Sequence, residues 1–215
     1  MKIEHFDVLI VGAGISGIGA GHHLQKNCPG KSFAILEGRA TFGGTWDLFS
    51  YPGIRSDSDM YTFGYSFKPW TNPKSIAAAP AILDYLRETI HENNLEQKIR
   101  FNHQLSKASW DSTHARWTVE IQHDDNQPAT TMTCSFLFMC SGYYSYREAY
   151  RPEFPGENDF IGQIIHPQFW PTDLDYRGKR VVVIGSGATA VTLVPSMADK
   201  VAHITLLQQI GRAHV

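Results

Sequence analysis

Residues 6–17 read Phe6-Asp7-Val8-Leu9-Ile10-Val11-Gly12-Ala13-Gly14-Ile15-Ser16-Gly17. The almost continuously apolar run that ends at Val11 predicts a strand buried on both faces of a parallel sheet. Residues 18–25 have the pattern of a helix, which the turn at 27–30 ends. A second strand is predicted over 32–36. Together these elements make a β-α-β unit and indicate an α/β fold.

The glycines between the first strand and the helix predict a dinucleotide site. Gly12 permits a tight turn, Gly14 lets the backbone approach a pyrophosphate, and Gly17 allows close packing of helix on strand. The helix N-terminus supplies positive charge and N–H donors for the phosphates. Glu37 stands twenty residues after Gly17, where a carboxylate accepts hydrogen bonds from ribose hydroxyls. A purely structural glycine turn is the alternative interpretation.

A second loop of this kind follows a predicted strand at 180–184, and the next strand is predicted at 204–207. The loop reads Gly185-Ser186-Gly187-Ala188-Thr189-Ala190, with alanine as an accepted variant at the third position. The second strand is followed by Gln208 and Gln209 and by no acid, which favours NADP over NAD. Two dinucleotide loops in one chain suggest that a flavin and a nicotinamide work together. A structural turn is again the alternative.

The rest of the chain divides into a helix, a strand-rich segment and a connector. Apolar residues at helical spacing predict a helix over 79–94. Residues 99–139 alternate between apolar and polar side chains and predict an antiparallel meander, a hairpin layer between the two β-α-β units. A connector rich in proline and tyrosine runs from 143 to 178.

Composition excludes several classes of protein. The 215 residues carry a net charge of −2, so no basic surface for nucleic acid is expected. The three cysteines, Cys28, Cys134 and Cys140, have no C-x-x-C spacing, so neither a disulfide framework nor a metal site is predicted. No apolar run approaches the ~18 residues of a membrane-spanning helix, and a cytoplasmic protein is expected.

Two further motifs carry a family resemblance. Gly44-Thr45-Trp46-Asp47, followed by Tyr51-Pro52-Gly53-Ile54-Arg55-Ser56-Asp57, resembles the flavin-loop signature of class B flavoprotein monooxygenases. Phe160-x-Gly162-x-x-x-His166-x-x-x-Trp170-Pro171 is similar to the type I Baeyer–Villiger monooxygenase fingerprint at every fixed position. The related N-oxygenating enzymes usually lack the final Trp-Pro. The resemblance extends from Phe6 to Gln208.

The resemblance implies two cofactors and a set of residues for each. FAD is expected against Gly12, Gly14, Ser16, Gly17, Glu37, Gly44, Thr45, Trp46, Asp47, Leu48, Asp57 and the backbone near Leu105. NADPH is expected against Arg55, Ser56, Asp57, Gly185, Ser186, Gly187, Ala188, Thr189, Ala190 and Gln208. In the family, NADPH reduces FAD, O₂ adds at flavin C4a, and the resulting peroxide oxygenates a ketone or a sulfur compound.

The resemblance also implies roles for single residues. Asp57 is expected to be catalytic, pairing with an active-site arginine and helping to hold the nicotinamide; a turn residue that caps the segment from Ser58 is the alternative. His166 lies in the connector, so a hinge or domain-coupling role is expected rather than proton transfer.

The domains implied are an FAD-binding domain at 1–145, the connector at 146–178 and the start of an NADP-binding domain at 179–209. The family's active-site arginine lies beyond this chain. Residues 210–215 match the peptide that a sequencing adapter encodes, so they are expected to be non-native, with arginine as the native residue at Gln209. The other functions to weigh are a flavin-dependent disulfide or quinone reductase and an inactive truncated fragment.

Overall fold

The computed structural model describes residues 3–123 and 127–208, which form two compact units. The first unit contains the described residues of 1–47 and 80–144, and the second contains those of 48–79 and 145–215. Gln209 and the expected non-native tail at 210–215 lie outside the described residues. Within the described ranges, no helix has both the length and the apolar character needed to cross a bilayer.

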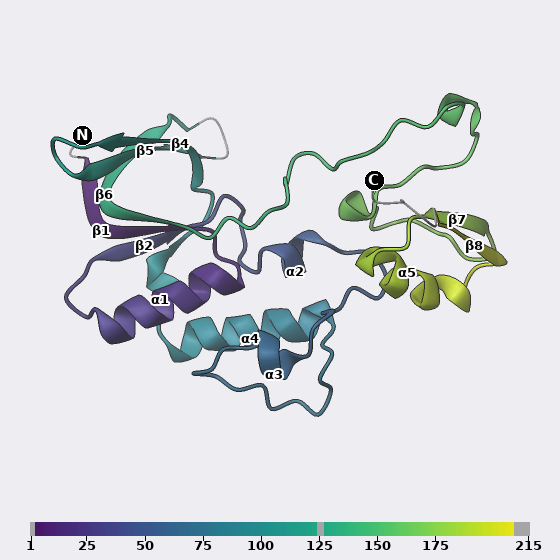
Figure 1. The fold of residues 1–215 in the computed structure, drawn as a ribbon, viewed down its shortest axis with the longest axis horizontal. Helices are drawn as coiled ribbons and strands as arrows, with labels where there is room; N and C mark the ends of the chain where they lie inside the picture. Colours follow the sequence, from purple (N-terminus) through teal and green to yellow (C-terminus); the bar gives the residue numbers. More distant parts are fainter. Residues whose placement is uncertain (1–2, 124–126, 209–215) are drawn as a thin grey trace, which may run out of the picture. The chain divides into compact units, whose positions relative to one another are not determined.

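The described chain contains five α-helices and eight strands. Most of them are labelled in Figure 1. In chain order they are β1 Glu4–Val11, α1 Ile15–Asn27, β2 Phe33–Leu36, α2 Thr45–Leu48, α3 Met60–Phe63, α4 Ala79–Glu92, β3 Ile99–Arg100, β4 Gln104–Asp111, β5 Arg116–Gln122, β6 Thr130–Met139, β7 Arg180–Ile184, α5 Ala188–Ala198 and β8 His203–Leu207. Short 3₁₀ turns occur at Glu96–Lys98, Glu157–Asp159 and Pro167–Phe169.

The first unit is built on one six-stranded sheet with the strand order β3-β2-β1-β6-β5-β4. β1 pairs in parallel with both β2 and β6, whereas β5 pairs antiparallel with β4 and β6. The predicted strand 6–11 and the first β-α-β unit are therefore confirmed, as is the α/β class. The strands of the sheet and α1 can be followed in Figure 1.

The predicted antiparallel meander is confirmed in β4, β5 and β6. It does not form a layer of its own, because two strands of the segment 99–139 belong to the parallel part of the same sheet. β6, the last strand of the meander, joins the parallel part of the sheet, with Glu4 opposite Met132 and Val11 opposite Met139. Ile99 belongs to β3, which pairs in parallel with β2. Alternation shows which face of a strand is buried but not which strand lies beside it, so the pattern could not distinguish the two arrangements.

Side chains on both faces of β1 and β2 are buried. On one face, Leu9 and Leu36 cluster with Val119 and Ile121 of β5. On the other face, α1 lies so close to the sheet that a Cβ on Gly21 would be 3.0 Å from Ile35 Cδ1. Burial on both faces explains why these strands are apolar without alternation.

Helix α4 presents one apolar face. Ile82, Leu86 and Ile90 are buried and recur at every fourth position, as the helical period requires. The helix ends at Glu92, two residues before the predicted end, because Asn94 adopts a left-handed conformation with φ 51°. Asparagine is among the few residues that tolerate this conformation.

The second unit contains the predicted second β-α-β element. β7 and β8 pair in parallel from Arg180 opposite His203 to Ile184 opposite Leu207. Tyr51, Leu193 of α5 and Met197 of α5 form its buried cluster, against which further half-buried apolar side chains pack. The segment just after residue 47 thus supplies part of the core that supports α5.

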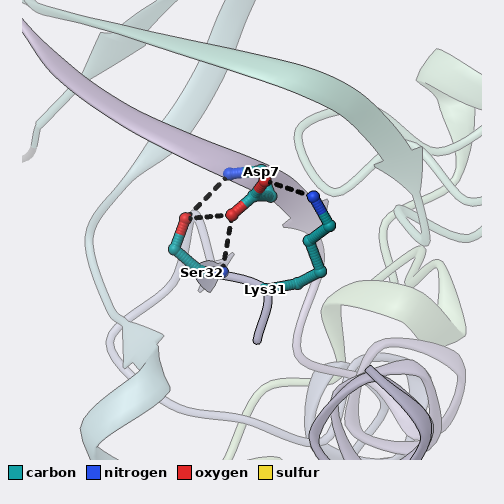
Figure 2. A network of polar contacts seen from close by, with 3 residues as sticks. All are labelled: Asp7, Lys31 and Ser32. Carbon is teal, nitrogen blue, oxygen red and sulfur yellow. Dashed lines mark hydrogen bonds and ion pairs between the residues drawn. The ribbon is translucent and has the colours of Figure 1, made fainter. Parts of the chain in front are cut away.

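A polar network joins β1 to the start of β2 (Figure 2). Asp7 Oδ2 accepts hydrogen bonds from the Ser32 amide and hydroxyl, both at 2.8 Å, and Lys31 Nζ lies 2.9 Å from Asp7 Oδ1. The Asp7 amide donates to Ser32 Oγ. The lysine and the serine donors hold the pKa of the Asp7 carboxyl well below its usual range.

Candidate functional site

Gly12 and Gly17 are required by the chain's own packing. Gly12 has φ 105°, and a Cβ there would lie 2.4 Å from the carbonyl oxygen of Cys140. A Cβ on Gly17 would lie 1.8 Å from the carbonyl oxygen of Gly12. The first glycine therefore makes the turn out of β1, and the third lets α1 begin against that turn.

Gly14 has no comparable internal reason to be glycine. Its backbone is extended, with φ −80° and ψ −171°, and it stands at the N-cap of α1. A Cβ there would meet nothing nearer than Gly44 Cα at 3.7 Å, an ordinary contact. The missing side chain leaves the backbone open at a helix N-terminus, where anions bind. Exposed Ser16 lies in the first turn of the same helix.

Glu37 is buried directly after β2 and fastens the glycine loop. Its Oε2 accepts a hydrogen bond from the Ala13 amide at 2.8 Å, and its Oε1 accepts one from the Arg39 amide at 3.0 Å. Each carboxylate oxygen has a second lone pair, so the expected ribose contact stays a prediction beside this structural role. Arg39 is not among the predicted site residues. Its position two residues after Glu37 is the only feature of the sequence that could have suggested a role for it.

The flavin-loop signature begins beside the first glycine loop. The Gly43 amide donates to Ala13 O at 3.0 Å, and Gly44 follows with φ 55°. Thr45, Trp46, Asp47 and Leu48 form α2 and are half-buried. Arg39 makes an ion pair with Asp47 at 2.6 Å. The structure thus brings Gly14, Glu37 and the start of this signature to the same end of the sheet.

The start of β4 adjoins the residues that follow β2. The His103 amide donates to Glu37 O at 2.8 Å, and Gln104 lies against Gly38. Leu105, expected near FAD through its backbone, is half-buried and packs on the core cluster of the first unit.

The segment Arg55-Ser56-Asp57 lies in the second unit and alternates in exposure. Ser56 is buried, and it is fixed to Ala77 by a bond from its amide at 2.8 Å and one to its hydroxyl oxygen at 3.0 Å. Arg55 and Asp57 on either side of it are exposed. The capping alternative for Asp57 does not hold, because Asp59 is the N-cap of α3 and accepts from the Thr62 amide.

The second glycine loop opens α5 in the way the first opens α1. Gly185 has φ 112° and donates its amide to Leu207 O, while Gly187 is the extended N-cap. In the part of the chain that the structure describes, no atom other than those of the chain neighbours lies within 4 Å of a Cβ added to either glycine. Ser186 and Ala188 are exposed, Thr189 is half-buried and Ala190 is buried. Gln208, just after β8, is exposed.

His166 has a local role in the connector. Its Nδ1 accepts a hydrogen bond from the Gln168 amide at 3.2 Å, so the ring caps the 3₁₀ turn that Pro167 opens. Gln168 is buried, and its side chain donates to the carbonyl of Ser145. These bonds give His166 a structural function within the connector, and the expected hinge role stays a prediction.

Both glycine loops have the form of a dinucleotide-binding turn. The fold and these two loops therefore define an α/β protein with two dinucleotide-binding folds. Residues 58–213 match the flavin-binding monooxygenase-like family, and residues 10–78 match the NAD(P)-binding Rossmann-like domain. The chain belongs to the flavin-binding monooxygenase-like family.

Curated relatives agree with this assignment. The chain is 59% identical over 207 residues to the FAD-containing monooxygenase EthA of Mycolicibacterium smegmatis, covering 96% of this chain and 42% of the relative. It is 57% identical to the probable FAD-binding monooxygenase AlmA of an Acinetobacter species, and the match covers 96% of this chain and 41% of the relative. The chain therefore spans about two fifths of the length of these relatives.

Solved structures agree as well. A steroid monooxygenase bound to NADP is 33% identical with a TM-score of 0.79, covering 94% of this chain and 38% of that one. OTEMO in complex with FAD and NADP is 29% identical with a TM-score of 0.79, and the match covers 97% of this chain and 39% of that chain.

Proposed function

We propose that this chain supplies the FAD-binding and NADPH-binding loops of a Baeyer–Villiger-type monooxygenase that oxygenates ketones or sulfur compounds. The observation that carries the proposal is the space left at Gly14 and Gly187. Neither glycine is required by internal packing, and each stands at the N-cap of a helix. A dinucleotide diphosphate is the group that such an open helix N-terminus suits.

The residues present fit the two cofactors. α1 would hold the FAD diphosphate, and Glu37 would accept from its ribose. α5 would hold the NADPH diphosphate, in keeping with the solved relatives that contain FAD and NADP. When bound, the flavin would supply the means to take a hydride from NADPH and to deliver one oxygen atom of O₂ to the substrate, with the other oxygen atom released as water. The chain's own part is to orient the two nucleotides, and exposed Asp57 is proposed to engage a cation near the nicotinamide.

A flavin-dependent reductase of the disulfide class is less well supported. Such an enzyme needs a reactive thiol pair, and burial raises the pKa of both Cys134 and Cys140. Both are free thiols, one within β6 and one directly after it. A raised pKa disfavours the thiolate that attacks disulfides.

The decisive experiment uses the complete polypeptide that the gene encodes, purified with its flavin. NADPH consumption is followed in air with cyclohexanone or thioanisole, and the products are identified by mass spectrometry. We expect substrate-dependent consumption with one oxygen atom incorporated from ¹⁸O₂. Consumption that needs a quinone and yields no oxygenated product would favour the reductase and contradict the proposal.

A further inference from the structure

Within the second unit, the turn Tyr51–Ile54 lies directly on helix α5. Gly53 has φ 79°, and a Cβ there would be 1.8 Å from Ser196 Oγ and 3.0 Å from Thr192 O. The backbone of the turn therefore touches the helix with no side chain between them. Such close approach is possible only for glycine, and the left-handed φ also favours it.

Tyr51 extends this contact towards the start of α5. The tyrosine is buried, with 7% of its surface exposed, against Leu193 and Met197. A hydrogen bond with the side chain of Thr189, the second residue of the helix, lowers the pKa of Tyr51. Thr189, Leu193 and Met197 recur every fourth residue and so share one face. Tyr51 packs on this face, and its hydroxyl reaches the first turn.

Burial is the main cause that raises the pKa of Tyr51, and the negative charge of Asp57 raises it further, whereas the hydrogen bond with Thr189 lowers it. A tyrosine with its ordinary pKa of about 10 is already neutral near pH 7, so its hydroxyl can donate to or accept from Thr189.

We propose that Tyr51 is a positioning residue for the nicotinamide cofactor: through Thr189 it holds the first turn of α5 in the orientation that binds the NADPH diphosphate. The inference rests on the proposed function, which assigns NADPH to this loop. Among the described residues beyond the neighbours in the chain, no atom lies within 4 Å of a Cβ built on Gly185 or Gly187, so no side chain packs against these two glycines. An anion site made of backbone amides depends on their direction, and a neighbouring side chain that fixes the turn preserves it.

The test uses the complete polypeptide and compares Tyr51→Phe with Tyr176→Phe. The first removes the hydroxyl and keeps the ring. The second removes a hydroxyl from a half-buried tyrosine that packs on the same apolar cluster. We expect Tyr51→Phe to raise the Kd for NADP⁺, measured by calorimetry, about two- to tenfold. The KM for NADPH should rise by the same factor, with kcat at saturating NADPH and FAD content unchanged. Tyr176→Phe should match the wild type.

A double-mutant cycle with Thr189→Val tests the hydrogen bond itself. If Tyr51 acts through Thr189, the double variant loses no more NADP⁺ affinity than the weaker-binding single variant, and Thr189→Ser recovers most of the loss. An unchanged Kd in Tyr51→Phe, equal losses in both tyrosine variants, or additive losses in the cycle would overturn the inference and leave the proposed function standing. A wild-type protein that binds FAD but not NADP⁺ would overturn both.

Discussion

At the scale of single residues, the glycines of the two loops fall into two groups. Gly12 and Gly17 are fixed by contacts with the chain itself, because a Cβ on either would overlap a carbonyl oxygen. Gly14 and Gly187 have ordinary backbone angles and room for a methyl group. A family motif assigns one pattern to all of these positions, whereas the structure separates the glycines that internal contacts require from those that have space beside them.

This separation predicts different outcomes for Gly14→Ala and Gly17→Ala in the complete polypeptide. Gly14→Ala should lose FAD, because its methyl group occupies the space needed by the diphosphate. Compared without flavin, the variant and the wild type should have nearly the same Tm. Gly17→Ala should lose stability by about 1–3 kcal/mol or more, the usual cost of overpacking. Thermal unfolding and the ratio of flavin to protein absorbance distinguish them. A Gly14→Ala protein with full flavin content would contradict the assignment of FAD to α1.

Glu37 carries a prediction about stability. Glu37→Gln replaces one acceptor oxygen with a donor facing an amide of the loop, which leaves the Ala13 or the Arg39 N–H unpaired. The cost of such an unpaired group is about 1–3 kcal/mol. Urea unfolding measures it, and Glu120→Gln is the control, since exposed Glu120 forms a surface ion pair with Lys107 at 3.4 Å. Equal effects of the two variants would argue against the role of Glu37 in holding the loop.

At the scale of elements, the Asp7 network links β1 to the turn before β2 and makes their association sensitive to acid. The pKa of Asp7 is lower in the folded chain than its unfolded value of about 4. Its contribution to stability is therefore present above about pH 4 and is lost as the pH falls towards the folded pKa. Glu4, whose pKa is lowered chiefly by its hydrogen bond with Arg100, contributes in the same direction.

The free energy of unfolding of the wild type should therefore fall as the pH drops below about 4. In Asp7→Asn this fall should be smaller but still present, because Glu4 still titrates. Urea unfolding at a series of pH values between 2.5 and 7 measures the slope. Asp84→Asn serves as control, since Asp84 forms an exposed ion pair with Arg87 on the same helix, α4. Parallel profiles for the wild type and Asp7→Asn would contradict the role of the network.

The elements show what could be predicted from sequence. β1, β7 and α4 were predicted to within a few residues, because continuous apolar runs and helical spacing are local signals. The parallel pairing of β6 with β1 was not, because strand neighbours depend on contacts far apart in the chain. In the candidate site, the glycine loops were identified from their spacing. The bonds of Glu37 to Ala13 and of Tyr51 to Thr189 join distant residues and had no local signal.

At the scale of the whole molecule, the described chain exposes apolar sheet surface. In the second unit, half-buried Val181 packs on the cluster that includes α5, whereas Val182 and Ile184 are 62% and 57% exposed. A parallel sheet is normally covered on both faces. Apolar surface of this kind favours association.

Ile184→Thr should reduce the binding of the dye ANS by the 215-residue chain and its self-association in sedimentation velocity, with little loss of stability. Threonine keeps the β-branched shape and removes apolar surface. Val181→Thr is the matched control on the covered face and should destabilise the chain, because it places a hydroxyl among apolar side chains. Equal ANS binding by the wild type and Ile184→Thr would contradict this interpretation of the exposed face.

The second unit is assembled from two separate stretches, 48–79 and 145–215, and Gly53 touches Ser196 across that gap in sequence. This has a consequence for hybrid genes. In a hybrid gene whose crossover lies between 79 and 145, the turn that contains Gly53 and the helix that contains Ser196 come from different parents. If the parent of the turn has a larger residue at position 53, that side chain would displace the turn from the helix. Hybrid proteins designed for a new cofactor preference should therefore exchange both stretches together.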